Sequence, residues 1–459
     1  MTAGRRAGAA LDALRAHPRH LVLAALAAGL LAGPLAAPPT VLLLGFAAAV
    51  LAGRPPLALL AAVAVLAGAL GAQARLHALD RTRLPPLFGA TVAARVVLLE
   101  QPRPVRFGHT ALARLAGNPS HPPSGERVML RIGQRVAWPP APTGALVDVR
   151  GRLRALGPFE SHYARRGAHA AISLDAAAAT PLRRGGALGV VDGIRTRAEH
   201  ALSAGLPHPQ AALLRGMTLG QDEALDERTR EEFRISSLAH VLAASGQNVA
   251  LLLALALPLL AAAGLGLRGR LIGALLLIAL YVPLAGAGPS IQRAGVMGAA
   301  TTVAALAGRP ASRWYALLLA AAATLAANPR ASGDPGWQLS FAAVAAIGLL
   351  APRIRHALTT RRMPRALADA AAMTAAATLG TAPLLALHFH QVSLVGIPAN
   401  LLAAPAVAPI TWLGMLAAAL GQLSPQLAEP LNALNAYLLA YVAGVAHMAA
   451  SVPHAGVSW

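Results

Sequence analysis

The sequence predicts a multi-pass α-helical membrane protein of about eleven spans with an inserted small all-β domain. Hydrophobic residues make up 56% of the 459 residues and charged residues only 12%, and the apolar residues gather in runs long enough to cross a bilayer. Residues 75–190 interrupt these runs with short alternating segments. Lysine and cysteine are both absent, so disulfides and thiolate metal sites are excluded.

Residues 1–74 are expected to form an N-terminal membrane segment. A signal peptide ending near Ala36 also fits the beginning of the chain, but further apolar runs follow at once and favour retained helices. The expected crossings are 21–36, 41–52 and 57–74. Four arginines precede the first crossing and place this end in the cytoplasm: Arg5, Arg6, Arg15 and Arg19.

Residues 75–190 are expected to form a small β-barrel outside the membrane. Segments such as A-L-V-D-V-R-G-R-L-R-A-L cluster or alternate apolar residues between loops rich in Pro, Gly, Asn and Ser, which is typical of short strands. Between Arg75 and Arg197 the chain has nineteen arginines and seven acids. A basic face suits a polyanion, and a solvated domain without a ligand is the alternative. The candidate contacts are Arg127, Arg131, Arg150, Arg152, Arg154, Arg165 and Arg166.

Residues 191–237 are predicted to be a connector of short amphipathic helices. Six acids crowd its last part and invite a metal-binding or catalytic interpretation. Their interleaving with arginines along a helical pattern instead favours a solvated face, so no metal site is expected. These acids are Asp222, Glu223, Asp226, Glu227, Glu231 and Glu232.

Residues 238–459 are expected to form the main membrane domain. When the spans alternate in direction, every strongly basic short loop falls on the cytoplasmic side, and the C-terminus lies outside. The expected crossings are 238–263, 271–285, 291–307, 314–327, 337–350, 367–387, 401–420 and 431–448.

Four polar segments, broken by Gly or Pro, interrupt this apolar domain. They begin at His240, Gly286, Asn328 and His388. Irregular backbone and ionisable side chains are costly in lipid, so each segment must line protein or water. The alternating topology places all four at the outer end of the membrane domain, where broken helices can gather around one cavity.

The same segments resemble a known family. L-L-R-G-M-T-L-G-Q-D-E-A-L followed by F-R-I-S-S-L-A-H-V-L-A-A-S-G-Q-N-V resembles the signature of the ComEC/Rec2 competence family, the inner-membrane channel for DNA uptake in transformation. G-P-S-I-Q-R-A-G-V-M, N-P-R-A-S-G-D-P-G-W-Q-L-S-F and H-F-H-Q-V-S-L-V-G-I-P-A-N-L-L-A-A-P are similar to the rest of its membrane domain. G-R-L-R-A-L-G-P-F-E-S-H-Y-A-R-R-G-A-H-A resembles the end of its OB-fold domain. Where many members read S-G-x-H-V, this chain has Asn248.

The resemblance implies a channel for single-stranded DNA in the inner membrane, with a cytoplasmic N-terminus and an extracytoplasmic OB-like domain and C-terminus. Full-length members continue into a metallo-β-lactamase-like domain proposed to degrade one strand, and this sequence contains no H-x-H-x-D-H. We therefore expect a form without that domain, not an enzyme and without nuclease activity or cofactor. A separate nuclease and a cytosolic helicase or ATPase motor are expected partners, because no G-x-x-x-x-G-K-[ST] occurs. A membrane-embedded hydrolase and a transporter of another anionic polymer remain alternatives.

Eleven residues of the polar segments are candidates for the DNA path. Arg293, within a predicted span and beside helix N-terminal amides, suits a phosphate; an ion pair with Asp334 or an outward-reaching side chain is the alternative. On a continuous helix His240 and Ser245 point apart, whereas Ser245 and Asn248 share a face at a helix interface or pore wall. The candidates are His240, Ser245, Gly246, Asn248, Ser290, Arg293, Asp334, Gln338, Ser340, His390 and Asn400.

Three of these candidates also have purely structural interpretations. Asp334 fits a helix N-cap, because Pro335 suits the first helical position. His390 and His388 lie about 200° apart on a helix, which is a poor geometry for one metal ion. Asn400 either lines the path or satisfies carbonyls freed by the prolines that follow it.

Overall fold

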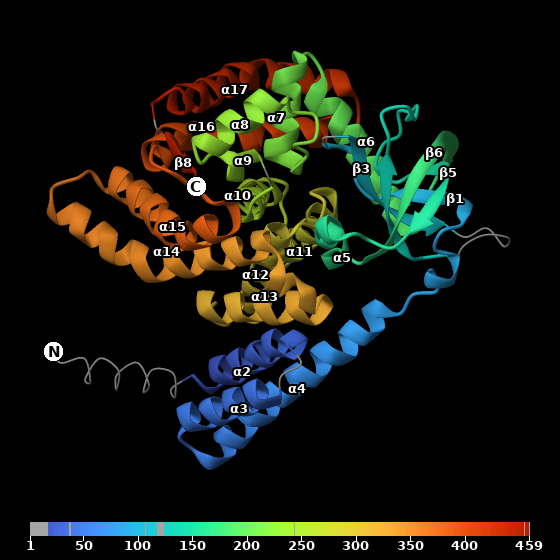
Figure 1. The fold of residues 1–459 in the computed structure, drawn as a ribbon. Helices are drawn as coiled ribbons and strands as arrows, with labels where there is room; N and C mark the ends of the chain where they lie inside the picture. The colour runs from blue at the N-terminus through green and yellow to red at the C-terminus, as the bar shows by residue number, and fades with distance from the viewer. Residues whose placement is uncertain are drawn as a thin grey trace. The chain divides into compact units, whose positions relative to one another are not determined.

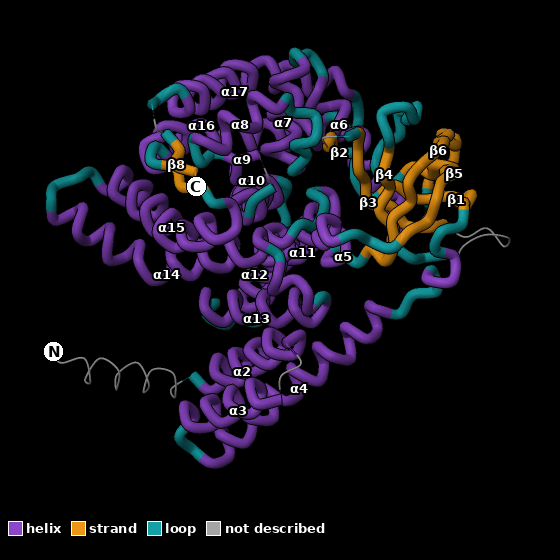
Figure 2. The backbone as a smooth tube through the Cα atoms, viewed as in Figure 1, coloured by secondary structure: helices purple, strands orange, loops and turns teal. Residues whose placement is uncertain are grey.

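The structure, a computed structural model, describes residues 17–35, 38–105, 107–116, 124–242, 244–453 and 455–458; Figure 1 shows it as a ribbon and Figure 2 by secondary structure. The chain divides into two compact units. The first comprises Met1–Arg81, Ala256–Ala279 and Pro289–Phe341, and the second comprises Thr82–Leu255, Leu280–Gly288 and Ala342–Trp459. Three of the arginines expected on the cytoplasmic side lie outside the described residues: Arg5, Arg6 and Arg15.

Three N-terminal helices form one layer of the first unit. Close packing of α2 against α4 depends on small residues: a Cβ at Gly29 would lie 2.0 Å from the Val65 carbonyl oxygen, and one at Gly68 would lie 2.4 Å from that of Leu26. Glycine at both places lets the two backbones approach, as in membrane helix pairs. The helices are α2 (Pro18–Ala32), α3 (Pro38–Ala52) and α4 (Pro55–Asp80).

The rest of the first unit contains α12 (Pro289–Leu306) and α13 (Arg313–Ala327), which pack together, and α13 also packs on α2. Ser312 caps α13 by accepting a hydrogen bond from the Tyr315 N–H at 3.3 Å. Three longer helices contribute residues to both units: α10 (Gly246–Ala262), α11 (Leu267–Leu284) and α14 (Pro335–Thr360).

The second unit contains a closed five-stranded β-barrel, as expected. Its strands follow the order β1-β5-β6-β4-β3, a β1–β3 pairing closes it, and β2 adds to β3. Only the β4–β6 pairing is parallel. Alternate residues such as Val96, Leu130 and Ile172 fill the interior. The strands are β1 (Thr91–Leu98), β2 (Arg103–Val105), β3 (Gly108–Ala116), β4 (Arg127–Ile132), β5 (Ala145–Arg154) and β6 (Ala168–Arg183).

One patch of the barrel's outer face is covered by the short helix α5 (Ser161–Arg165). Tyr163 packs there on Leu112 and Met129, and all three are buried. Beyond this patch Arg131, Arg150 and Arg152 are exposed on the outer face, so α5 leaves these arginines uncovered.

The connector helices join the C-terminal helices in one apolar core, which includes Leu214, Phe233 and Val442. Asn432, fully buried, donates to the Ala201 and Ala204 carbonyls at 2.7 and 2.8 Å. These elements are α6 (Gly186–Ser203), α7 (His208–Leu219), α8 (Glu227–Ile235), α16 (Gly396–Leu420) and α17 (Glu429–Ala450). The unit is completed by α9 (Ala239–Leu242), α15 (Arg365–Phe389), β7 (Gln391–Ser393) and β8 (Gly456–Ser458).

Each of the predicted crossings overlaps a helix of the described chain. Seven helices are long and apolar enough to span a membrane by length and composition: Pro18–Leu35, Pro55–Leu87, Leu267–Leu284, Pro335–Thr360, Arg365–Phe389, Gly396–Leu420 and Pro425–Ala450. The total of about eleven spans therefore stays a prediction. The crossing expected at 337–350 lies within α14, which continues past Arg353 and Arg355 to Thr360.

Candidate functional site

Arg293 lies four residues after Pro289, the first residue of α12. It is 6% exposed, and its Nε and Nη1 groups are buried without a hydrogen-bond partner among the described residues. Its Cζ lies 5.9 Å from the centroid of the Phe341 ring, within cation–π range. A buried guanidinium normally finds acceptors, so Arg293 leaves donors that an anion can satisfy.

The first turn of α12 adds to the positive potential near Arg293. The first N–H groups of a helix have no intrahelical acceptor and carry a partial positive charge. Ser290, half-buried, lies in this turn. Arg293 and the α12 N-terminus together therefore favour a negatively charged group.

Asp334 does not pair with Arg293 in the structure. Its Oδ1 instead accepts the Trp337 N–H at 3.0 Å, which caps the start of α14 and confirms the N-cap interpretation. Trp337 donates its indole N–H to Thr324 Oγ1 at 3.0 Å, and Gln338 donates to the Ser332 carbonyl at 2.7 Å. This polar segment is thus held by its own hydrogen bonds beside the Arg293 site.

Asn248 closes the C-terminal end of the connector helix α7. The last carbonyls of a helix lack intrahelical donors. The Asn248 side-chain amide donates to one of them, the Met217 carbonyl, at 2.8 Å. The Tyr281 hydroxyl donates to the next carbonyl, that of Thr218, at 2.6 Å, and accepts from Asn248 at 3.1 Å. Ser245 Oγ donates to Asn248 Oδ1 at 3.2 Å. Of the two interpretations of this pair, the structure favours the helix interface.

The first and fourth polar segments meet at Ser237, whose backbone is left-handed with φ 60°. Its carbonyl lies 3.0 Å from His240 Nδ1 and 3.5 Å from the Asn400 amide nitrogen. Asn400 also donates to the Gly396 carbonyl at 2.7 Å, so it satisfies backbone, as one of its interpretations held. Among the described residues no hydrogen bond joins His240 to Ser245, so these two side chains do not form a nucleophile–base pair.

Two of the remaining membrane-domain candidates lie at helix ends and one lies inside a helix. Gly246 begins α10, and Ser340 is buried within α14. His390, exposed, ends α15 with a left-handed φ of 50°. Within the described ranges no group of three or more His, Asp or Glu residues could hold a metal ion.

Several of the barrel arginines are already engaged. Arg154 pairs with Glu160. Burial opposes ionisation of that carboxyl, but the Arg154 contact and the Gly157 N–H together outweigh it and lower its pKa. Arg166 pairs with Glu100 at 2.6 Å, and its carbonyl accepts from Arg127 at 2.6 Å. Burial, with Arg114 and Arg166 nearby, lowers the pKa of Arg127.

The other barrel candidates are more open. Arg152 donates to the Gly89 carbonyl at 3.1 Å and is otherwise exposed. Arg131 and Arg150 are exposed on β4 and β5. Arg165 ends α5. The candidate set therefore separates into arginines that hold the barrel together and arginines that face outward.

Sequence reasoning missed Tyr281 and Arg195. Tyr281 is a single hydroxyl in an apolar span, which is a weak sequence signal for a functional contact. Its burial and its two hydrogen bonds show that the hydroxyl is used. Arg195, 8% exposed, donates from Nε to the Leu284 carbonyl at 3.1 Å and from Nη2 to that of Pro283, and so caps α11 as Asn248 caps α7. One arginine in an amphipathic pattern gives no signal of this contact, because its acceptor in Leu284 lies 89 residues further along the chain.

Apolar helices of membrane-spanning length and an inserted β-barrel define the class of this chain, a membrane protein with an inserted β domain. A profile of the competence protein family matches residues 217–459. The chain belongs to that family, ComEC/Rec2, and the resemblance seen in the sequence motifs is confirmed.

Two curated proteins are similar in sequence to this chain. ComE operon protein 3 of Bacillus subtilis (strain 168) is 28% identical over 200 residues, which is 44% of this chain and 25% of the relative. The uncharacterized protein YcaI of Escherichia coli (strain K12) is 31% identical over 236 residues, 48% of this chain and 30% of the relative. The match thus spans less than a third of either relative. No solved structure matches this chain.

Proposed function

We propose that this protein is an inner-membrane channel that takes up single-stranded DNA during natural transformation. Membership of the competence family supports a role in DNA uptake. The observation that carries the channel role is Arg293, whose buried Nε and Nη1 find no acceptor in the part of the chain that the structure describes. A passing phosphate would supply those acceptors and then leave, since a single cationic site binds a strand without trapping it.

The membrane arrangement follows the alternation of basic loops. About eleven spans put the N-terminus in the cytoplasm and both the β-barrel and the C-terminus outside. The closed barrel, with one parallel pairing, is taken as an OB-fold, a class whose strands bind oligonucleotides. It would meet the strand before the membrane domain does.

The polypeptide is proposed to move DNA without cutting it. Its capping and hydrogen-bonding contacts involve no paired nucleophile and base in the described residues, and His240 and Ser245 make separate contacts. A separate nuclease and a cytosolic helicase or ATPase motor are its proposed partners.

Arg293→Met tests the phosphate contact. A charge-assisted hydrogen bond is worth about 1.5–3 kcal/mol, so DNA uptake should fall about 10- to 100-fold in a transformable host that depends on this protein. Because the variant removes a buried charge without acceptors, thermal stability in detergent should hold or rise. If Arg293 were purely structural, the variant would instead unfold at a lower temperature.

Arg309→Ala is the matched control. Arg309 is an exposed arginine just beyond the other end of α12, so the same loss of charge should leave uptake unchanged. Normal uptake by Arg293→Met at normal membrane abundance would refute the phosphate contact. Loss of uptake of another anionic polymer, with DNA uptake intact, would favour the transporter alternative.

A further inference from the structure

A single row of side chains crosses the whole outer face of the barrel. The strand register pairs Arg103 with Thr110, Thr110 with Arg131, Arg131 with Ser173, Ser173 with Arg152 and Arg152 with Thr91. Residues paired in register point to the same face of a sheet. In the order β2, β3, β4, β6, β5 and β1, the row is Arg103, Thr110, Arg131, Ser173, Arg152 and Thr91.

The row faces outward and alternates guanidinium with hydroxyl. The arginines and Thr91 are exposed, and Thr110 and Ser173 are half-buried, while their chain neighbours Ala111, Ile172 and Leu174 fill the interior. Arg131 and Arg152 lie two strands apart, or about 10 Å. Each pair of cations is therefore separated by a hydroxyl that can donate to the same anionic chain.

Thr110 is prepared as a donor. Its Oγ1 accepts the buried Tyr163 hydroxyl at 2.8 Å, so its own hydrogen remains available to point outward. Tyr163 belongs to α5, which covers the neighbouring apolar row. The helix thus borders the polar row on one side and orients one of its hydroxyls.

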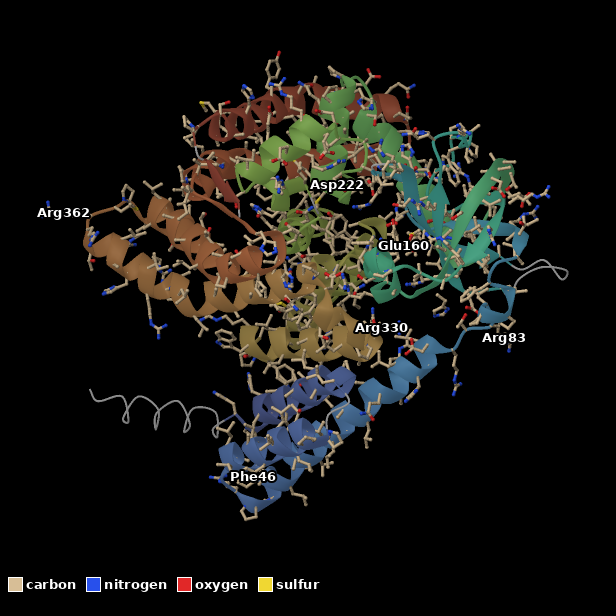
Figure 3. The ribbon with its side chains drawn as sticks, in the orientation of Figure 1. Phe46, Arg83, Glu160, Asp222, Arg330 and Arg362 are labelled. Atoms are coloured by element: carbon tan, nitrogen blue, oxygen red, sulfur yellow. The ribbon has the colours of Figure 1, made fainter. Side chains whose placement is uncertain are left out.

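Two connector carboxylates occupy the Arg103 end of the row. Arg103 Nη2 lies 3.2 Å from Glu223 Oε1 and 3.5 Å from Asp222 Oδ1; Figure 3 labels Asp222 in the segment that follows α7. The Arg103 side chain is 47% exposed and that of Glu223 only 13%. Carboxylate and phosphate oxygens make the same kind of contact with a guanidinium.

We propose that this row binds a single-stranded phosphodiester chain, and that Asp222 and Glu223 close its Arg103 end until the chain displaces them. The inference rests on the proposed function for the identity of the strand, and it adds the path on the barrel and its closure. A duplex, with a persistence length of about 50 nm, cannot follow the curve of a small barrel. A flexible single strand can reach arginines on successive strands.

The closure also links the barrel to the membrane domain. Gln221, next to Asp222, donates to Glu199 Oε1 at 2.5 Å and accepts from Arg215 at 3.1 Å. Gln221 follows α7, whose C-terminal carbonyls are those held by Asn248 and Tyr281. A strand that displaces the carboxylates therefore disturbs the residues that follow α7, whose end is held by Asn248 of the first polar segment.

The row itself is tested by binding of fluorescein-labelled oligothymidylate to the full chain in detergent. Ser173→Ala changes no charge, yet it should weaken binding about fivefold through one lost hydrogen bond. Arg131→Ala should weaken it about tenfold or more, and Arg135→Ala, an exposed arginine off the row, about twofold or less. Unchanged binding by Ser173→Ala, or equal losses for Arg131→Ala and Arg135→Ala, would overturn the row. The affinity for a duplex of the same length should change less when Arg131 is replaced.

The closure is tested with Asp222→Asn/Glu223→Gln. Binding should tighten, and the slope of log K against log salt should steepen by about 0.7, the value for one more phosphate contact with a single strand. Adding Arg103→Ala should cancel the steeper slope. Glu227→Gln/Glu231→Gln, the same charge change on α8, is the control and should leave the slope unchanged. Identical behaviour of the two double variants would refute the closure.

These outcomes are separable from the proposed function. Arg293→Met should leave oligothymidylate binding by the row intact while uptake falls. If the row binds as expected but Arg293→Met takes up DNA normally, the phosphate contact proposed for the channel fails and the binding site on the barrel stands. If binding is insensitive to the row while Arg293→Met loses uptake, the row fails and the channel stands.

Discussion

Replacing Asn248 by alanine tests whether this residue is a helix cap or part of the pore wall. Asn248 is 5% exposed and donates to the Met217 carbonyl at 2.8 Å and to the Tyr281 hydroxyl at 3.1 Å. The Met217 carbonyl belongs to the last turn of α7, where no helical donor reaches it. The variant would leave that acceptor buried and unsatisfied.

The expected cost of Asn248→Ala is about 2–4 kcal/mol in the free energy of unfolding. The lost bond to Tyr281 contributes about 1 kcal/mol and the orphaned Met217 carbonyl about 1–3 kcal/mol. Tyr281 keeps its bond to the Thr218 carbonyl, which limits the loss. Tyr281→Phe, which removes that bond as well as one partner of Asn248, should cost a similar amount.

Thermal unfolding of the purified chain in detergent measures this cost, together with DNA uptake in a complemented host. Gln247→Ala is the control, because Gln247 is the exposed neighbouring residue and its loss should change neither quantity. If Asn248→Ala unfolds at the same temperature as Gln247→Ala while uptake alone falls, the cap argument is refuted and Asn248 lines the path.

Two further predictions concern the barrel. Gly144 has φ 88°, and a Cβ there would lie 2.1 Å from Asp192 Oδ2, so Gly144→Ala should break the Arg184–Asp192 pair and lower the free energy of unfolding by about 2–4 kcal/mol. Gly89→Ala is the control, because Gly89 has φ 90° but a Cβ there meets nothing within 4 Å, and it should cost only about 1–2 kcal/mol. Equal protease sensitivity of the two variants would contradict the clash at Gly144. Burial opposes ionisation of Glu126, but hydrogen bonds from Thr82, the Arg83 N–H and His169 outweigh it and lower its pKa. Its stabilisation is therefore present above the unfolded pKa of about 4.3 and lost as pH falls through the lower folded value, so Glu126→Gln should flatten the pH dependence of barrel hydrogen exchange below about pH 4.3; an unchanged profile would rule this out.

The sequence alone determined the elements of this protein. Apolar runs of fixed length can satisfy their backbone in lipid only as helices, and the predicted crossings overlap helices throughout the described chain. Alternation with a period of two identified the barrel strands, because one face of each must fill the interior. The cap at Asp334 was also predictable, since the signal consists of adjacent residues and needs no distant partner.

The tertiary structure decided which polar groups find partners. Whether Arg293 pairs with Asp334 depends on how α12 meets α14, and Asn248 caps α7 only because Tyr281, in another helix, lies beside it. The arginine row exists only through the register of six strands, which brings together residues from Thr91 to Ser173. Local patterns fix helices and strands through nearest-neighbour geometry, whereas hydrogen bonds and charges between distant segments are set by packing, which the spacing of residues along the chain does not encode directly.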